Sequence, residues 1–342
     1  MRCIVLLIAA GWIEVSAVWA VSPAVPSLDG SLRATACDPD LVLGNQSCVK
    51  CHASEIKAWE KTPHARTFDE LHRRPEAQQI AAKLGLNSIK HAGRCTACHY
   101  TPQTDSATGS AHMIAGVSCE SCHGAAKPWI ELHHDYGGEG ITRISEPATH
   151  RRQRIDRSVA MGMRNPANVY LVAQSCLRCH TTGDEELVNV GGHSAGSLDF
   201  EFVSWSQGTI RHNFVRTDGV TNEVSSQPRL RLMFVAGMIA ELEASLRATA
   251  MATEKATFGL TAAKRAARAG ARLKSVVAKV DQPILDQVVA VFASVTLKLR
   301  NADQLNRAAD EVARLGFEFA ADGSGEGLES LDRFSPSSDA WK

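Results

Sequence analysis

Residues 111–134 read AHMIAGVSCESCHGAAKPWIELHH and contain the pattern that decides the fold. Cys119 and Cys122 are separated by two residues, and His123 follows at once. This C-x-x-C-H pattern is typical of haem c attachment, in which both thiols bond to the porphyrin and the histidine coordinates the iron. Further histidines flank the motif on both sides. The stretch therefore predicts one haem site and candidate ligands for other haems.

The same motif occurs four times in the chain. A single C-x-x-C could instead be half of a zinc site or a redox-active pair. Neither alternative requires a histidine after the second cysteine in all four copies. The sequence therefore predicts four covalent haem c groups. The attaching cysteines are Cys48, Cys51, Cys95, Cys98, Cys119, Cys122, Cys176 and Cys179, and the proximal ligands are His52, His99, His123 and His180.

The sixth ligand of each iron decides the chemistry. Nine of the 13 histidines are not proximal: His64, His72, His91, His112, His133, His134, His150, His193 and His212. Two histidine ligands make a haem an electron carrier, whereas an open position would bind nitrite, hydroxylamine, NO or peroxide. Methionine is a further alternative, at Met113, Met161 or Met163. With four irons, at least five of the nine histidines have another role.

The first 20 residues predict a signal peptide. Arg2 is followed by the apolar run 4–10, and Val18-Trp19-Ala20 resembles a cleavage site, although Glu14 interrupts the pattern. We expect a soluble protein that is periplasmic or otherwise exported, because haem c is attached outside the cytoplasm. Residues 21–43 predict a flexible lead-in in which Cys37 is a linker thiol.

The rest of the chain divides by composition. Residues 44–215 contain all four motifs and predict a tetrahaem cytochrome domain with little regular sheet. No cysteine or histidine follows His212. Residues 228–322 predict a helical bundle, because apolar residues recur at helical spacing. They are Val235, Ile239, Leu242 and Leu246, and later Leu305, Val312, Leu315 and Phe319. Residues 323–342 predict a disordered tail. The fold class is therefore mainly α.

Charge gives weaker evidence. A formal net charge of +0 gives no support to nucleic-acid binding. Two basic runs could contact haem propionates or an acidic redox partner, but a solvated helix face would look the same. The first is Arg151, Arg152, Arg154 and Arg157, and the second is Lys264, Arg265, Arg268, Arg272, Lys274 and Lys279.

The motifs and their surroundings resemble the cytochrome c-554 family of tetrahaem cytochromes. The resemblance rests on the string GVSCESCHG at 116–124, on Trp59 followed by His64-Ala65, and on the four motifs, and it covers about residues 44–213. It implies haems packed in close pairs and an electron-carrier function. In ammonia-oxidiser members the donor is hydroxylamine oxidoreductase. We therefore expect redox proteins as donor and acceptor, such as an oxidoreductase or a membrane-bound quinone-linked cytochrome.

The resemblance also implies distal ligands. They are His64 for the third haem, His133 for the first, and His212 or its rival His193 for the fourth. The family pattern leaves the second haem, on His99, without a distal histidine. His112 lies seven residues before Cys119, and we expect it to close that haem here.

Two other functions remain open from the sequence. One is an enzyme that acts on a small nitrogen oxide at a five-coordinate haem. The other is a haem-wire subunit of a larger complex, which would make the chain part of an oligomer. The helical region after Pro228 could orient the cytochrome on its partner.

Overall fold

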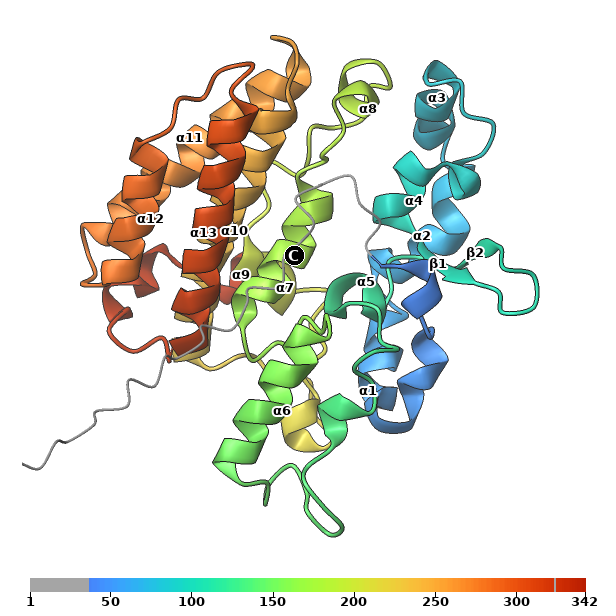
Figure 1. The fold of residues 1–342 in the computed structure, drawn as a ribbon, viewed down its shortest axis with the longest axis vertical. Coiled ribbons are helices and arrows are strands. Elements are labelled where there is room, and N and C mark those ends of the chain that lie inside the picture. Colours follow the sequence, from blue (N-terminus) through green and yellow to red (C-terminus); the bar gives the residue numbers. More distant parts are fainter. Residues whose placement is uncertain (1–36, 323) are drawn as a thin grey trace, which may run out of the picture.

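The computed structural model describes residues 37–322 and 324–342, so the predicted signal peptide and most of the lead-in lie outside it. The described chain is mainly helical, as the sequence predicts, with one small two-stranded sheet. None of its helices is both long enough and apolar enough to cross a membrane. Figure 1 shows the helical bundle on one side, the first three motifs on the other, and α7 between them.

The N-terminal part consists of short helices and one hairpin. Its elements are α1 Val49–Trp59, α2 Pro63–Glu70, α3 Pro75–Lys83, α4 Gly93–His99, β1 Thr101–Thr104, β2 Ala111–Ala115 and α5 Cys119–His123. The strands pair antiparallel, with Thr104 opposite Ala111. Helix α2 begins where Thr62 accepts a hydrogen bond from the Ala65 amide and Pro63 occupies the first turn.

Each motif lies at a helix or at its end. The first begins α1, where His52 departs from helical geometry (φ −121°, ψ 36°). The second ends α4, the third forms α5, and the fourth ends α7. The elements of this middle part are α6 Ala148–Ala160, α7 Val169–His180, α8 Glu185–Asn189 and α9 Phe202–Gln207.

The C-terminal bundle contains four helices: α10 Gln227–Met251, α11 Thr257–Val277, α12 Pro283–Ala293 and α13 Ala302–Asp322. Helix α10 lies at its centre and packs against α7, α9, α11 and α13. The apolar residues predicted to share a face are buried, including Val235, Leu242 and Leu315, each with 0% exposure. Helix α12 begins at Pro283, where the missing amide of proline costs no helical hydrogen bond.

The hydrophobic core is continuous across the predicted boundary at 216–227. Tyr170 and Leu177 of α7 are fully buried in the same cluster as Leu242 of α10 and Phe319 of α13. The fourth motif therefore belongs to a helix that is also part of the bundle. The bundle has no core separate from the cytochrome part.

Both ends of the described chain are more ordered than the sequence predicts. The tail, expected to be disordered, forms a 3-10 helix at Glu329–Phe334 and inserts Leu328 and Leu331 into the core. Within the lead-in, Cys37 is buried rather than part of a mobile linker, and its thiol donates to the Glu120 carbonyl at 2.9 Å. Burial raises the pKa of this thiol to about 12. In both segments, a few buried side chains pack against the rest of the protein although the surrounding sequence is polar: Leu328 and Leu331 in the tail, and Cys37 in the lead-in.

Candidate haem centre

Four pairs of histidine rings face each other, and each pair contains one histidine of a C-x-x-C-H motif. The pairs are His52 with His133 at 6.4 Å between ring centres, and His64 with His180, His99 with His193, and His123 with His212, each at 6.2 Å. Every proximal histidine predicted from the sequence thus has one histidine opposite it.

These separations fit a metal ion between the rings. Two metal–imidazole bonds of about 2 Å, together with the offset of each nitrogen from its ring centre, give a centre-to-centre separation of about 6 Å. Rings in direct stacking contact would lie closer. The paired histidines therefore have the spacing that two axial ligands of one haem iron need.

Hydrogen bonds orient five of the paired rings through the Nδ1 atom. His133, His193 and His212 contact the carbonyl oxygens of Ile130, Ser194 and Ile210 at 2.5–2.8 Å. The other two are His123, with the Arg164 carbonyl at 3.3 Å, and His180, with the Ser197 hydroxyl at 2.8 Å. A ring whose Nδ1–H donates in this way presents Nε2 as the free lone pair. These contacts favour the tautomer that coordinates a metal through Nε2.

Burial keeps the buried imidazoles uncharged. Desolvation, followed by the charge of the facing histidine, lowers the pKa of His99, His123 and His180 to about 4. Desolvation also lowers the pKa of His64 and His133. Since a metal binds the neutral imidazole, these rings are in the ligating form at neutral pH.

The ring positions correct three of the four expected pairings. His133 faces His52 as expected. His64 faces His180 instead of His123: α2 packs against α4, and the His64 ring lies opposite His180 at the end of α7. His212 consequently faces His123 instead of His180. Motif order along the chain does not reveal these neighbours, because they depend on how α2 and α7 pack.

His112 is not placed to close the second haem. It lies on β2 with an exposed side chain, opposite Gln103 in the register of the hairpin. His193 occupies the position that we expected for His112, facing His99 from the loop after α8. His112 lies in the exposed first part of β2, where Ala111 and His112 are exposed and the three residues that follow are half-buried.

The cysteines of different motifs also meet. The Cys48 thiol is in hydrogen-bonding contact with that of Cys119, and the Cys98 thiol with that of Cys179. Helix α5 packs against α7, where an Arg178 amino group donates to the Ser121 carbonyl at 3.3 Å. The motifs are therefore neighbours in the order first, third, fourth and second.

Glu120, inside the third motif, was not singled out from the sequence. Its buried carboxylate accepts hydrogen bonds from the backbone amides of Leu43, Gly44 and Ala126 at 2.8–3.0 Å. It thereby joins the segment before the first motif to the segment after the third. The available signal was a glutamate placed between the two attaching cysteines of one motif.

The structure explains two further residues on which the family resemblance rests, Gly116 and Trp59. A side chain at Gly116 would lie 2.4 Å from the Thr67 hydroxyl and 2.5 Å from the His64 carbonyl, so glycine allows α2 to approach. The Trp59 indole donates to the Val117 carbonyl at 2.8 Å. Together these contacts hold the end of α1 and the start of α2, with His64, against the segment just before the third motif.

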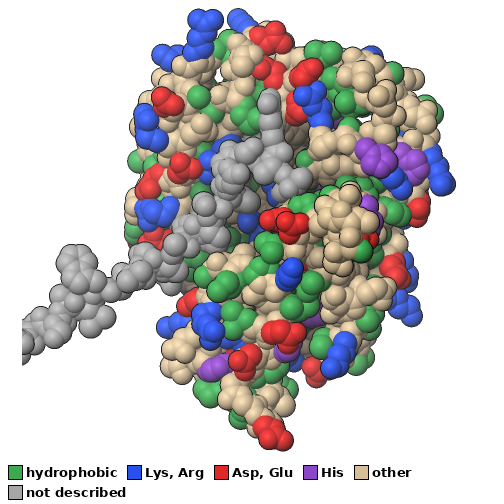
Figure 2. Space-filling view, turned by 45° about the vertical axis from the view of Figure 1, so that its right-hand side comes forward, with side chains coloured by type: hydrophobic (Ala, Val, Ile, Leu, Met, Phe, Trp, Pro, Cys, Tyr) green, Lys and Arg blue, Asp and Glu red, His purple; other side chains and the backbone are tan. Residues whose placement is uncertain are grey.

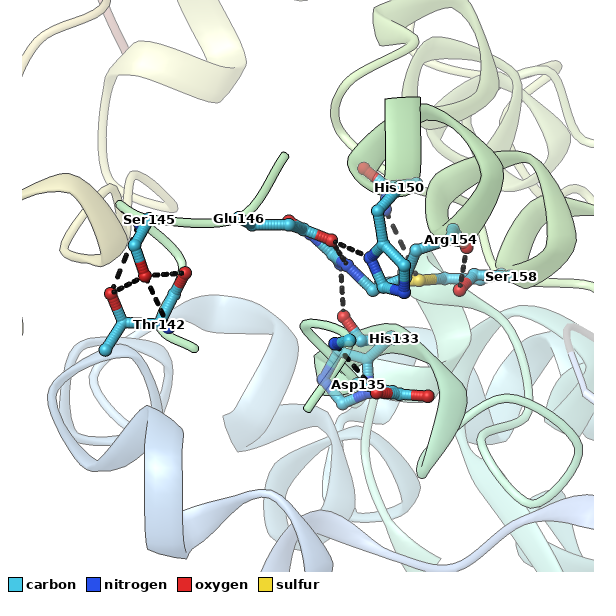
Figure 3. A network of polar contacts seen from close by, with 11 residues as sticks. His133, Asp135, Thr142, Ser145, Glu146, His150, Arg154 and Ser158 are labelled. Atoms are coloured by element: carbon cyan, nitrogen blue, oxygen red, sulfur yellow. Dashed lines mark hydrogen bonds and ion pairs between the residues drawn. The ribbon is translucent and has the colours of Figure 1, made fainter. Parts of the chain in front are cut away.

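An ion pair supports the loop that carries His133 (Figure 3). Arg154 donates to the His133 carbonyl at 2.5 Å and forms two hydrogen bonds with the Glu146 carboxylate at 2.6–2.7 Å. His150 contacts the same carboxylate at 2.8 Å. Arg154, one of the four arginines in the first basic run, is therefore neither a solvated residue nor a docking residue. It positions the loop that carries His133.

This ion pair predicts an acid-sensitive contribution to stability. The hydrogen bond from Arg154, assisted by His150, lowers the pKa of Glu146 from 4.5 to about 2. A carboxyl with a lowered folded-state pKa stabilises the fold above pH 4.5 and loses that contribution as pH falls toward 2. We expect the free energy of unfolding of wild type to fall more steeply across this range than that of Glu146→Gln. Chemical denaturation between pH 6 and 3 measures this, with Glu139→Gln in the neighbouring exposed loop as control. Parallel curves for wild type and Glu146→Gln would contradict it.

The site thus contains four neighbouring copies of one unit, which consists of two thiols, a motif histidine and a second histidine that faces it. This arrangement is typical of a multihaem c-type cytochrome. Comparison with known proteins agrees with this class. The family model described as "Cytochrome c554 and c-prime" matches residues 47–124, which contain the first three motifs. The chain is also 28% identical over 105 residues to cytochrome c-554 of Nitrosomonas europaea.

That match covers 28% of this chain and 43% of the relative, so it spans less than half of the curated protein's length. No solved structure matches the chain. The resemblance to the cytochrome c-554 family predicted from the sequence is confirmed by the family match and the relative. The four motifs and these similarities are those of c-type cytochromes, a class that binds haem c covalently.

Proposed function

We propose that this protein is a tetrahaem electron carrier in which each iron has two histidine ligands. The four facing ring pairs carry this proposal. Haem supplies the one-electron chemistry. The protein fills both axial positions, so the iron changes oxidation state with little rearrangement and has no site for a substrate.

The contacts between motifs support a continuous electron path. Thiols of the first and third motifs touch, as do those of the second and fourth, and α5 packs against α7 between them. Haems held by these motifs would follow one another in the order one, three, four, two. The first and second motifs, at the two ends, would then serve for entry and exit of electrons. The His52 side chain at the first end is 36% exposed, which suits exchange with a partner.

The partners are redox proteins, one donor and one acceptor, outside the cytoplasm. Haem c attachment and the sequence of residues 1–20 support export. Figure 2 shows acidic and basic side chains interspersed over one face, in keeping with a formal net charge of +0. Docking on that face therefore relies on local contacts more than on a long-range field of one sign.

Spectroscopy of the mature protein tests the proposal. Intact-mass measurement should give four covalent haems per chain. The electron paramagnetic resonance spectrum of the oxidised protein should contain only low-spin signals. The reduced protein should not bind CO or NO. A high-spin signal or a CO adduct in wild type would favour a nitrogen-oxide enzyme instead, and fewer than four haems would contradict the count.

A further inference from the structure

Arg265, on α11 of the bundle, lies directly behind the fourth motif. Its Nη1 atom donates to the His180 carbonyl at 3.0 Å, although the two residues are 85 positions apart. Its side chain is only 3% exposed. A bundle residue therefore places a guanidinium group, which is charged in proteins, against the backbone of a proximal histidine.

The charge of Arg265 is only weakly neutralised by the protein. The nearest carboxylate oxygen is Glu241 Oε1, 3.9 Å from Nε, and the same carboxylate pairs with Arg268 at 2.9 Å and Arg272 at 3.4 Å. Among the described residues, the Nε and Nη2 atoms of Arg265 have no hydrogen-bond acceptor. Three guanidinium groups thus share one carboxylate.

Another buried arginine of the bundle shows the difference. Arg247 contacts two carboxylates, Glu243 and Asp310, each at 2.9 Å. The charge of Arg247 is matched by these two carboxylates. Arg265, in contrast, shares the more distant Glu241 carboxylate with two other arginines. An unmatched charge in a poorly solvated region acts over a longer distance than the same charge in water.

We propose that Arg265 raises the reduction potential of the haem coordinated by His180. Reduction adds one electron, and a nearby positive charge stabilises the reduced state relative to the oxidised state. This inference rests on the proposed function, which assigns the fourth haem to His180 and His64. It gives the C-terminal bundle a specific role, since the bundle supplies a buried positive charge to one haem of the path.

The proposal is tested by removing the positive charge of Arg265 in one variant and the negative charge of its neighbour Glu241 in another. Potentials of all four haems are measured by spectroelectrochemical titration of the loaded protein. In Arg265→Met, one potential should fall by about 59 mV, equivalent to a tenfold change in the one-electron equilibrium with its neighbour. Glu241→Gln should raise the same potential, and Arg265→Lys should stay near wild type. Arg231→Met is the control, because Arg231 pairs with Glu329 and Asp332 at the tail.

The affected haem is identified with His64→Ala, which removes the residue facing His180. The shifted potential should belong to the haem whose spin state changes in that variant. Four low-spin haems with unchanged potentials in both Arg265→Met and Glu241→Gln would overturn the role of Arg265 and leave the electron-carrier proposal intact. A shift confined to another haem would overturn it too. If Arg265→Met does not fold, an unchanged potential in Glu241→Gln is sufficient to reject it.

Discussion

In the His193→Ala variant, one of the four haems should change from low spin to high spin. His193 faces His99 at 6.2 Å between ring centres and has its Nδ1 atom bound to the Ser194 carbonyl. Without this ring the second iron has an open position. Electron paramagnetic resonance of the oxidised variant should show a high-spin signal from one haem, and the reduced variant should bind about one CO per chain.

The matched control is His112→Ala. His112 was the ligand expected from the sequence, but its side chain is exposed on β2. We expect its removal to leave the spin state and CO binding of every haem unchanged. The reverse result, a high-spin haem in His112→Ala and none in His193→Ala, would show that the hairpin and not the loop after α8 closes the second haem.

Glu120→Ala should give the largest loss of stability among the single substitutions considered. The Glu120 carboxylate is 1% exposed and accepts hydrogen bonds from the amides of Leu43, Gly44 and Ala126. Hydrogen bonds to a charged group contribute about 1.5–3 kcal/mol each, and a buried donor left unpaired adds a further cost. The variant should therefore lose at least about 3 kcal/mol of unfolding free energy.

Denaturant titration of the loaded protein measures this loss. Glu131→Ala is a suitable control, because that side chain is 90% exposed and belongs to the same stretch, residues 111–134. Glu120→Gln, which keeps one acceptor oxygen, should be intermediate. Equal stability of Glu120→Ala and Glu131→Ala would mean that the three amides find other acceptors and that Glu120 does not join the two segments.

The sequence predicted what depends on local spacing. The four motifs, the mainly helical fold and the apolar faces of α10 and α13 follow from residues at most a few positions apart. The partners of the other facing histidines did not follow, although His64, His193 and His212 were all named as candidates. His64 could face either His123 or His180, and the choice depends on how α2 packs against α4 and α7. Nine spare histidines also gave more candidates than irons, so composition alone could not select among them.

The domain organisation was harder to predict for a related reason. The absence of cysteine and histidine after His212 marks a change in composition, yet Tyr170 and Leu177 of α7 pack in the bundle core. Tail order depends on Leu328 and Leu331, two apolar residues in a segment that is otherwise rich in glycine, serine and acidic residues. A compositional boundary therefore need not be a boundary between cores.

Helix α7 carries the fourth motif and is also part of the bundle core, and this has a consequence for maturation. One end of this helix carries Cys176 and Cys179, while its length completes the apolar core around α10. Cys176 packs against that core, so a fully docked α7 offers its thiols poorly to an attaching enzyme. Assembly of the bundle and attachment of the fourth haem thus compete for one helix. We therefore expect haem attachment at the fourth motif to precede closure of the bundle.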